Sequence, residues 1–202
     1  MKKIMFNTKL GLEQSVLEGR KTQTRRIVPK EFFTLQWDVR DDTLVVENEF
    51  GEFVDIRNTK YCMFKVGEIV AVAQSYKDIF SAFSQKPNPQ LNISVKNPTD
   101  TAGWNNKMFV KPELMPHKIR ITDVRVERLQ YISDDDCLKE GIVKGQCGSA
   151  DTHFMDAYYV PNDIQPYCKP QYAYEILIDK VSGKGTWEKN PYVFVYDFEL
   201  VK

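Results

Sequence analysis

The chain has 202 residues, 42% of them hydrophobic, and its 28 basic residues equal its 28 acidic residues in number. This length and apolar content can bury a sizeable core, and we expect a single domain over residues 1–202 with insertions. The balanced charge excludes bulk attraction to nucleic acid, so a polyanionic partner must be met by a local basic patch.

The N-terminal segment MKKIMFNTKLGLEQ has no sustained apolar stretch, so it lacks the hydrophobic region of a secretory signal. No run of the chain approaches the length of a membrane span. We therefore expect a cytoplasmic protein with no membrane partner. The oligomeric state does not follow from the sequence.

The cysteines are widely spaced and form no C-x-x-C pair: Cys62, Cys137, Cys147 and Cys168. The only histidines are His117 and His153. This spacing favours buried or incidental thiols in a reducing cytoplasm over metal ligands or disulfides. We therefore expect no metal site and no cofactor.

A short helix is expected over about residues 8–18, where Leu10, Leu12 and Val16 give an apolar face. Asn7 or Thr8 can cap its first turn, since a side-chain oxygen can accept from the free N–H groups there. Gly19 is suited to end it, because glycine enters the left-handed conformation without penalty. The basic segment EGRKTQTRRIVPK continues directly from this helix.

The next expected elements are strands. Residues 44–46 and 53–56 predict a hairpin that turns near Gly51. Residues 69–72 predict a further strand, whose entry is marked by Gly67. The alternation at residues 119–126 predicts another, with a kink or bulge at Thr122 and Asp123.

The segment SDDDCLKEGI predicts a short helix over residues 133–140, with Ser133 as its N-cap and three aspartates where the helix dipole favours negative charge. Gly141 is expected to lie beyond its last turn. The alternating residues 192–201 predict a half-buried strand near the end of the chain.

Two stretches, at about residues 77–116 and 144–172, show no lasting period and are expected to be irregular insertions. Several short strands with few short helices predict a mainly β (α+β) fold. The expected architecture is a small, closed or nearly closed sheet with helices at its rim.

Five segments together resemble the ASCH domain of phage and bacterial proteins: GRKTQTRR, VGEIVAV, RITDVRVERLQYIS, the helix ending EGI, and the closing NPYVFVYDFEL. The resemblance spans Phe6 to Leu200 apart from the irregular stretches, and the motifs are fairly specific in combination. It implies a fold similar to the PUA-like β-barrel of RNA-binding modules, with a cleft lined by the loop after the first helix.

The resemblance also implies candidate site residues. In the bacterial amidohydrolases that deacetylate N4-acetylcytidine, that loop supplies a lysine and a threonine, and a glutamate completes the triad. Lys21, Thr24 and Glu140 fall on those positions, and Arg26 falls on the following arginine. Many phage relatives have a glutamate where this chain has Gln74, so a general-acid role there would be lost.

We therefore expect catalytic roles for Lys21, Thr24 and Glu140, and nucleoside or nucleic-acid contacts from Arg20, Arg25, Arg26 and Gln74. Thr24 can attack an acyl carbon, a desolvated Lys21 can act as its base, and Arg26 can hold the acyl oxygen. A helix-like turn would bring Lys21 and Thr24 to one side.

Simpler interpretations remain open at this stage. Arg20 and Arg25 are equally consistent with solvated surface charges, Thr24 with a strand position, and Lys21 and Glu140 with a structural salt bridge. The first functional hypothesis is a metal-independent amidohydrolase acting on an acylated pyrimidine nucleoside. The alternative is a binding module that holds RNA or a nucleotide without turnover; nuclease activity has only fold analogy behind it.

Overall fold

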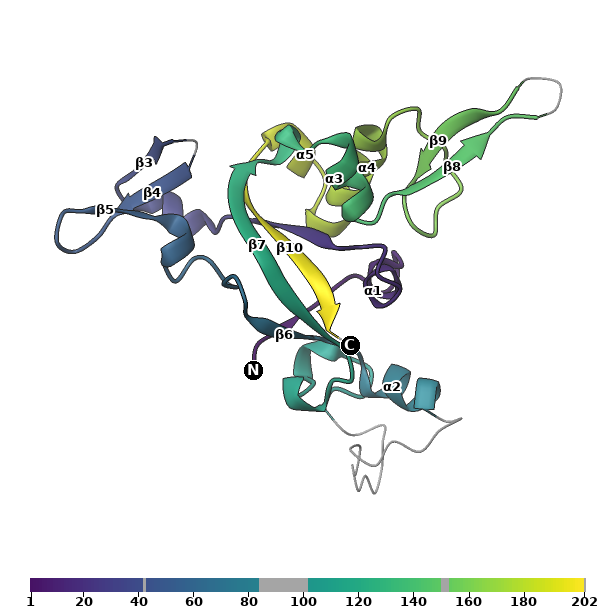
Figure 1. Cartoon of the computed structure of the whole chain (residues 1–202), viewed down its shortest axis with the longest axis horizontal. Coiled ribbons are helices and arrows are strands. Elements are labelled where there is room, and N and C mark those ends of the chain that lie inside the picture. The colour runs from purple at the N-terminus through teal and green to yellow at the C-terminus, as the bar shows by residue number, and fades with distance from the viewer. Residues whose placement is uncertain (42, 84–101, 150–152, 202) are drawn as a thin grey trace.

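A five-stranded sheet in the order β1-β6-β7-β10-β2 forms the centre of the computed structural model (Figure 1), which describes residues 1–41, 43–83, 102–149 and 153–201. β1 runs parallel to β6, and the other neighbouring strands are antiparallel. The strands are β1 (Lys3–Ile4), β2 (Gln23–Ile27), β6 (Ile69–Val72), β7 (Lys118–Arg128) and β10 (Tyr192–Val201).

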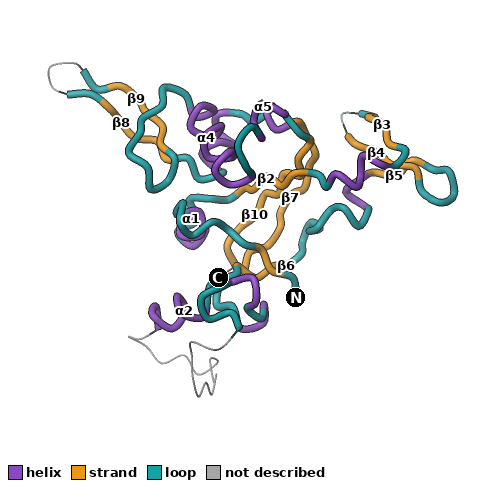
Figure 2. Tube along the Cα trace, turned by 180° about the vertical axis from the view of Figure 1, so that it is seen from behind, coloured by secondary structure: helices purple, strands orange, loops and turns teal. Residues whose placement is uncertain are grey.

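Two smaller sheets lie at opposite sides of the central sheet (Figures 1 and 2). One contains β3 (Trp37–Arg40), β4 (Thr43–Glu47) and β5 (Phe53–Asp55). The other is the hairpin of β8 (Val143–Cys147) and β9 (Met155–Tyr159).

The helices lie around the central sheet (Figure 1). α3 (Asp134–Lys139), α4 (Pro170–Ser182) and α5 (Thr186–Lys189) lie toward one end of its strands, α2 (Tyr76–Phe83) lies toward the other, and α1 (Leu12–Leu17) lies beside them. None of the helices in the described ranges is both long enough and apolar enough to cross a membrane.

The long strands β7 and β10 pair along most of their length and form the central part of the core. β10 pairs with β7 on one edge and with β2 on the other, and its residues Val193 to Tyr196 are buried in succession. The expectation of a half-buried strand was therefore wrong for this stretch, which is buried on both faces. The valines on one face and the aromatic residues on the other both pack against neighbours. The register between β10 and β7 shifts between Asp197 and Phe198, which leaves Thr122 as the expected bulge.

The turns after α1 and α3 bring two distant segments together. Gly19 and Gly141 have φ angles of 74° and 109°, which glycine adopts readily, and both helices end as predicted. The Thr22 N–H then donates to the carbonyl of Lys139 at 2.9 Å. The start of β2 therefore lies against the C-terminal end of α3.

Most of the local predictions are confirmed. The hairpin of β4 and β5 turns through Gly51, β6 has the predicted bounds, and the Ser133 hydroxyl accepts from the Asp136 N–H at 3.1 Å as the N-cap of α3. The first helix is shorter than predicted and begins after Gly11, because the Asn7 side chain caps a preceding turn by accepting from the Leu10 N–H.

The expectation of an irregular stretch at 144–172 was wrong, because it contains most of the β8–β9 hairpin and the start of α4. The stretch at 77–116 begins within α2, its residues 84–101 lie outside the described ranges, and its residues 102–116 contain neither a strand nor an α-helix. The mixed α+β class is confirmed, with strands in several sheets and few helices. The PUA-like barrel stays a prediction.

Candidate functional site

A cavity of about 430 Å³ lies where β2, the end of α3 and α4 meet. Its lining includes the predicted residues Lys21, Thr24, Arg25, Arg26 and Glu140. Apolar side chains from the N-terminal segment, α1 and α4 complete the wall: Phe6, Leu12, Leu177 and Ile178. The cavity thus combines mainly apolar walls with a cluster of charged groups, a composition typical of small-molecule sites.

Lys21 is a buried charged group of this cavity, with 2% of its surface exposed. Its ammonium donates to the Gln23 carbonyl at 2.7 Å, the Glu140 carbonyl at 2.7 Å and the Glu140 carboxylate at 2.6 Å. Burial lowers the pKa of Lys21 below its ordinary value, and the charge of Glu140 opposes that change. All three N–H groups of a charged Lys21 therefore have acceptors.

Arg25 does not lie at the surface, so it is neither a solvated surface charge nor placed to contact a phosphate backbone. Its side chain has no exposed area, and one terminal nitrogen donates to Glu127 at 2.6 Å and Asp136 at 3.0 Å. The other donates to the Gln23 side chain and to Glu140 at 3.4 Å. Arg25 is turned toward α3 and β7 because strand alternation points it away from Thr24.

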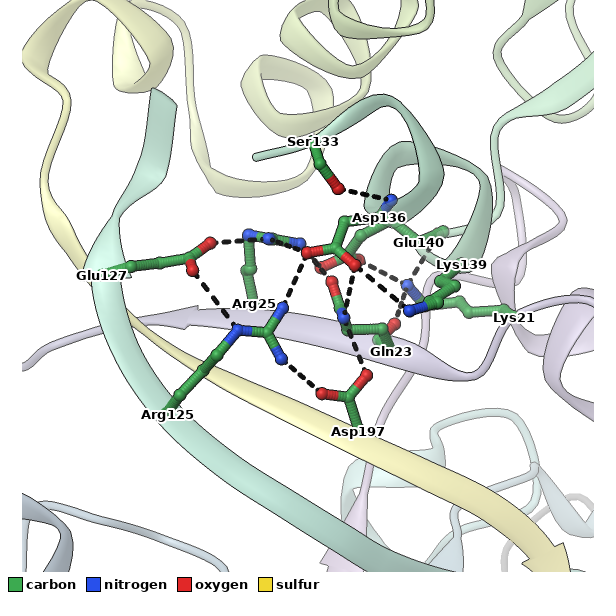
Figure 3. Close-up of polar contacts among 10 residues, drawn as sticks. All are labelled: Lys21, Gln23, Arg25, Arg125, Glu127, Ser133, Asp136, Lys139, Glu140 and Asp197. Carbon is green, nitrogen blue, oxygen red and sulfur yellow. Dashed lines mark hydrogen bonds and ion pairs between the residues drawn. The ribbon is translucent and has the colours of Figure 1, made fainter. Parts of the chain in front are cut away.

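A wider set of ion pairs surrounds Arg25 (Figure 3). Arg125 of β7 donates to Asp136 of α3 at 2.7 Å and pairs with Asp197 of β10. The Gln23 amide joins the same two carboxylates, at 3.1 Å to Asp136 and 2.7 Å to Asp197. These contacts hold β2, β7, β10 and α3 together behind the cavity.

Thr24 and Arg26 share the other face of β2. Thr24 is buried, with 5% of its surface exposed, and its hydroxyl has no hydrogen bond within the described ranges. Arg26 donates to the Met5 carbonyl at 2.8 Å and lies over the Phe6 ring at 5.9 Å. The helix-like turn expected between Lys21 and Thr24 is wrong, because Lys21 precedes β2 and Thr24 lies within it.

Two of the predicted contact residues lie elsewhere. Arg20 is exposed and pairs with Glu18 at 2.6 Å. Gln74 is buried outside the cavity lining, and its amide nitrogen lies 3.5 Å from Glu13, which is paired with Lys107 at 2.7 Å. A second cavity of about 760 Å³ runs beside Lys107 and adjoins the first along Phe6.

Tyr174 is a cavity residue that sequence reasoning missed, because it lies on α4, which was not predicted. Tyr174 is 1% exposed and lines the cavity beside Arg25. A local signal for α4 exists: Pro170 is suited to the first helical position, and Gly183 follows the last turn. Between them, apolar residues recur at helical spacing: Ala173, Tyr174, Leu177 and Ile178.

The thiols take no part in this cavity. Cys62 and Cys137 are buried, Cys147 is partly exposed and Cys168 is exposed, all as free thiols. Burial raises the pKa of the Cys137 thiol to about 12, so it stays protonated at neutral pH. Among the described residues, no three His, Cys, Asp or Glu side chains gather as metal ligands would.

Comparison with known proteins finds no matching family model, no matching curated protein and no matching solved structure. The resemblance to ASCH domains therefore stays a prediction that is carried by the residues quoted for it.

Proposed function

We propose that this chain is an ASCH-type amidohydrolase with a PUA-like core, which removes an acyl group from a modified pyrimidine nucleoside. The observation that carries the proposal is the meeting of Lys21, Thr24 and Glu140 at one cavity, although Lys21 and Glu140 are 119 residues apart in the chain. A hydroxyl without an internal partner, in the lining of the same cavity as a buried lysine, supports this chemistry.

In the proposed reaction, the Lys21–Glu140 pair shares one proton between two groups. The reactive form is the one in which the shared proton has moved to Glu140 and Lys21 is an amine; burial lowers the pKa of Lys21 and so makes this form accessible from the ion pair. The Thr24 oxygen attacks the acyl carbon and its proton passes to the Lys21 amine. Glu140 protonates the leaving nitrogen, so the C–N bond breaks and a Thr24 ester with a free nucleoside amine results.

Water completes the cycle. Glu140, now a carboxylate, takes a proton from water as the water oxygen attacks the ester. Lys21 returns a proton to the Thr24 oxygen as the ester bond breaks, which releases the carboxylic acid and restores the neutral pair. Arg26, on the Thr24 face of β2, donates to the acyl oxygen while it carries negative charge.

One observation favours a second candidate function. Because each N–H of the charged Lys21 already has an acceptor, the pair with Glu140 is also consistent with a structural salt bridge. In that case the cavity binds RNA or a nucleotide without turnover.

The test is release of free acid from a panel of acylated nucleosides that includes N4-acetylcytidine. Thr24→Ala is expected to lower the rate at least about a thousandfold while affinity changes by only a few-fold, because a nucleophile acts mainly in the transition state. Thr24→Ser keeps a hydroxyl and is expected to retain part of the activity. Thr22→Ala is the matched control, since Thr22 does not line the cavity.

Acyl release that persists in Thr24→Ala would rule out the proposed nucleophile. Binding of a nucleoside or RNA by the unmodified chain, with no turnover of any member of the panel, would favour the second candidate.

A further inference from the structure

The strand β3 forms an open edge of the small three-stranded sheet. It pairs with β4 on one side, and within the described ranges no strand pairs with its other side. The small sheet extends away from the central sheet and the helices around it (Figures 1 and 2). Two apolar side chains of this edge strand are exposed, Trp37 by 38% and Val39 by 43%. Such an edge can pair with a strand of another chain.

The hydrogen bonds of the small sheet show which backbone groups of β3 point outward. The Gln36 carbonyl accepts from the Glu47 N–H at 2.9 Å, so Gln36 directs its backbone groups toward β4. In an antiparallel pair this direction alternates along the strand, so the backbone groups of Trp37 and Val39 point away from β4. The Val39 N–H agrees with this direction, because it donates to the Asp38 carboxylate at 2.8 Å.

The residues between these positions carry opposite charges. Asp38 and Arg40 have 54% and 52% of their side chains exposed, and they pair with each other at 3.3 Å. The Arg40 guanidinium also lies over the Phe53 ring at 4.0 Å. Within the described ranges only its Nε–H has an acceptor, so its terminal nitrogens are open to a second carboxylate.

These charges distinguish the ways in which two copies of β3 could pair antiparallel about a two-fold axis. Outward-pointing residues must lie opposite each other, so the axis passes through a residue and not between two. Centring on Asp38 or on Arg40 places that residue opposite its own copy, and like charges directly opposite destabilise a sheet. Centring on Trp37 places Asp38 opposite the uncharged Gln36. Only centring on Val39 places each Asp38 opposite the Arg40 of the other copy.

We propose that β3 is a self-association edge, where two copies of this chain pair antiparallel about Val39 and join their small sheets into one. The two Val39 residues exchange backbone hydrogen bonds, and an Asp38–Arg40 pair between the copies lies on each side of them. A strand of four residues buries little area, so we expect a weak dimer that forms with increasing concentration. No residue of β3 is among those that line the cavity, so this inference does not rest on the proposed function.

The first arm of the experiment is sedimentation velocity of the full chain from micromolar to millimolar concentration. The average mass is expected to rise toward that of two chains. Asp38→Arg and Arg40→Asp each place like charges opposite each other twice in a symmetric dimer, so each is expected to weaken association at least about tenfold. Glu199→Arg and Arg120→Asp are the matched controls, because they make comparable charge changes in an exposed pair of the central sheet, and they are expected to leave association unchanged.

The second arm mixes the two β3 variants, one of them with a fluorescent label. One chain then carries two arginines at these positions and the other carries two aspartates, so every charge on the shared edge lies opposite its counterpart. Neither variant is expected to self-associate, whereas the mixture is expected to form a dimer with one chain of each. Because both positions are exposed, both variants are expected to melt close to the unmodified chain.

The inference is overturned if the unmodified chain keeps the mass of one chain at millimolar concentration. It is equally overturned if the β3 variants weaken association no more than the controls, which would place the interface elsewhere. A mixture that does not associate would contradict the register centred on Val39. Association restored in the mixture alone assigns both the edge and its register.

Discussion

At the scale of single residues, the buried Lys21–Glu140 pair is the feature on which the proposed function depends. Removing two charges from water is costly, and their attraction compensates only when the remaining donors and acceptors are satisfied. Here Lys21 has two backbone carbonyls besides the carboxylate, and the second oxygen of Glu140 lies 3.4 Å from Arg25. Loss of Lys21 would therefore leave Glu140 with a charged partner, whereas loss of Glu140 would leave the Lys21 ammonium with backbone carbonyls alone.

This asymmetry gives a stability prediction. Glu140→Gln leaves the Lys21 ammonium buried without a carboxylate, and we expect it to lower the free energy of unfolding by about 3–5 kcal/mol. Lys21→Met leaves Glu140 with Arg25 as a partner, so we expect roughly half that loss. Urea unfolding of both variants measures the difference. A Lys21→Met variant that is less stable than Glu140→Gln would show that Arg25 does not support the carboxylate.

At the scale of elements, the cavity depends on two short helices whose ends are set by glycines. A Cβ atom added to Gly19 would meet nothing within 4 Å, whereas one added to Gly141 would lie 3.3 Å from Leu12 and 3.7 Å from Lys21. Gly141 therefore combines a backbone requirement with a close approach to the cavity lysine. Gly19 has the backbone requirement alone.

Alanine substitutions separate these two requirements. Gly19→Ala is expected to lower the free energy of unfolding by about 1 kcal/mol, the strain of a left-handed alanine. Gly141→Ala, at a φ of 109°, is expected to cost about 2–3 kcal/mol because crowding against Leu12 adds to the strain. Chemical denaturation measures both, and Gly19→Asn, which tolerates this conformation, is expected to cost less than Gly19→Ala. Equal losses at the two glycines would mean that the contact with Leu12 relaxes freely.

The same elements show what sequence reasoning could and could not predict. Strands with strong alternation and helices with clear caps, such as the one starting after Ser133, follow from local patterns. The helix α4 was not predicted, because its stretch begins among prolines and tyrosines and has no side chain that caps its first turn. Strand order and the meeting of Lys21 with Glu140 depend on packing across more than a hundred residues, which no local pattern contains. Family resemblance alone pointed to that pair.

At the scale of the whole molecule, paired charges connect the central sheet to the helices that frame the cavity. Asp136 of α3 accepts from Arg25 of β2 and Arg125 of β7, and Asp197 of β10 joins through Arg125 and Gln23 (Figure 3). Asp136 therefore lies at the centre of a set of contacts from three strands. Because these contacts all involve Asp136 directly or through Arg125 and Gln23, protonation of this carboxylate is expected to weaken the packing of α3 against the three strands.

Acid should weaken this arrangement through Asp136. Burial alone would raise the pKa of Asp136, but hydrogen bonds from Arg25 and Gln23 and the charge of Arg125 bring it below its ordinary value of 3.8. Because the unfolded chain then binds the proton more readily, the stabilisation is fully present above about pH 4 and is lost as the pH falls through the lower folded-state value.

Asp136→Asn removes this contribution, and we expect it to lower the free energy of unfolding by about 1–3 kcal/mol at pH 7 and by progressively less below pH 4. Asp135→Asn is the matched control, since Asp135 is the exposed neighbour in the same helix turn. Urea unfolding between pH 2.5 and 7 measures the gap between the two variants. A gap that stays constant over this range would mean that Asp136 stabilises the sheet through hydrogen bonds that do not require its charge, whereas a gap that closes in acid ties the shape of the cavity to the ionised carboxylate.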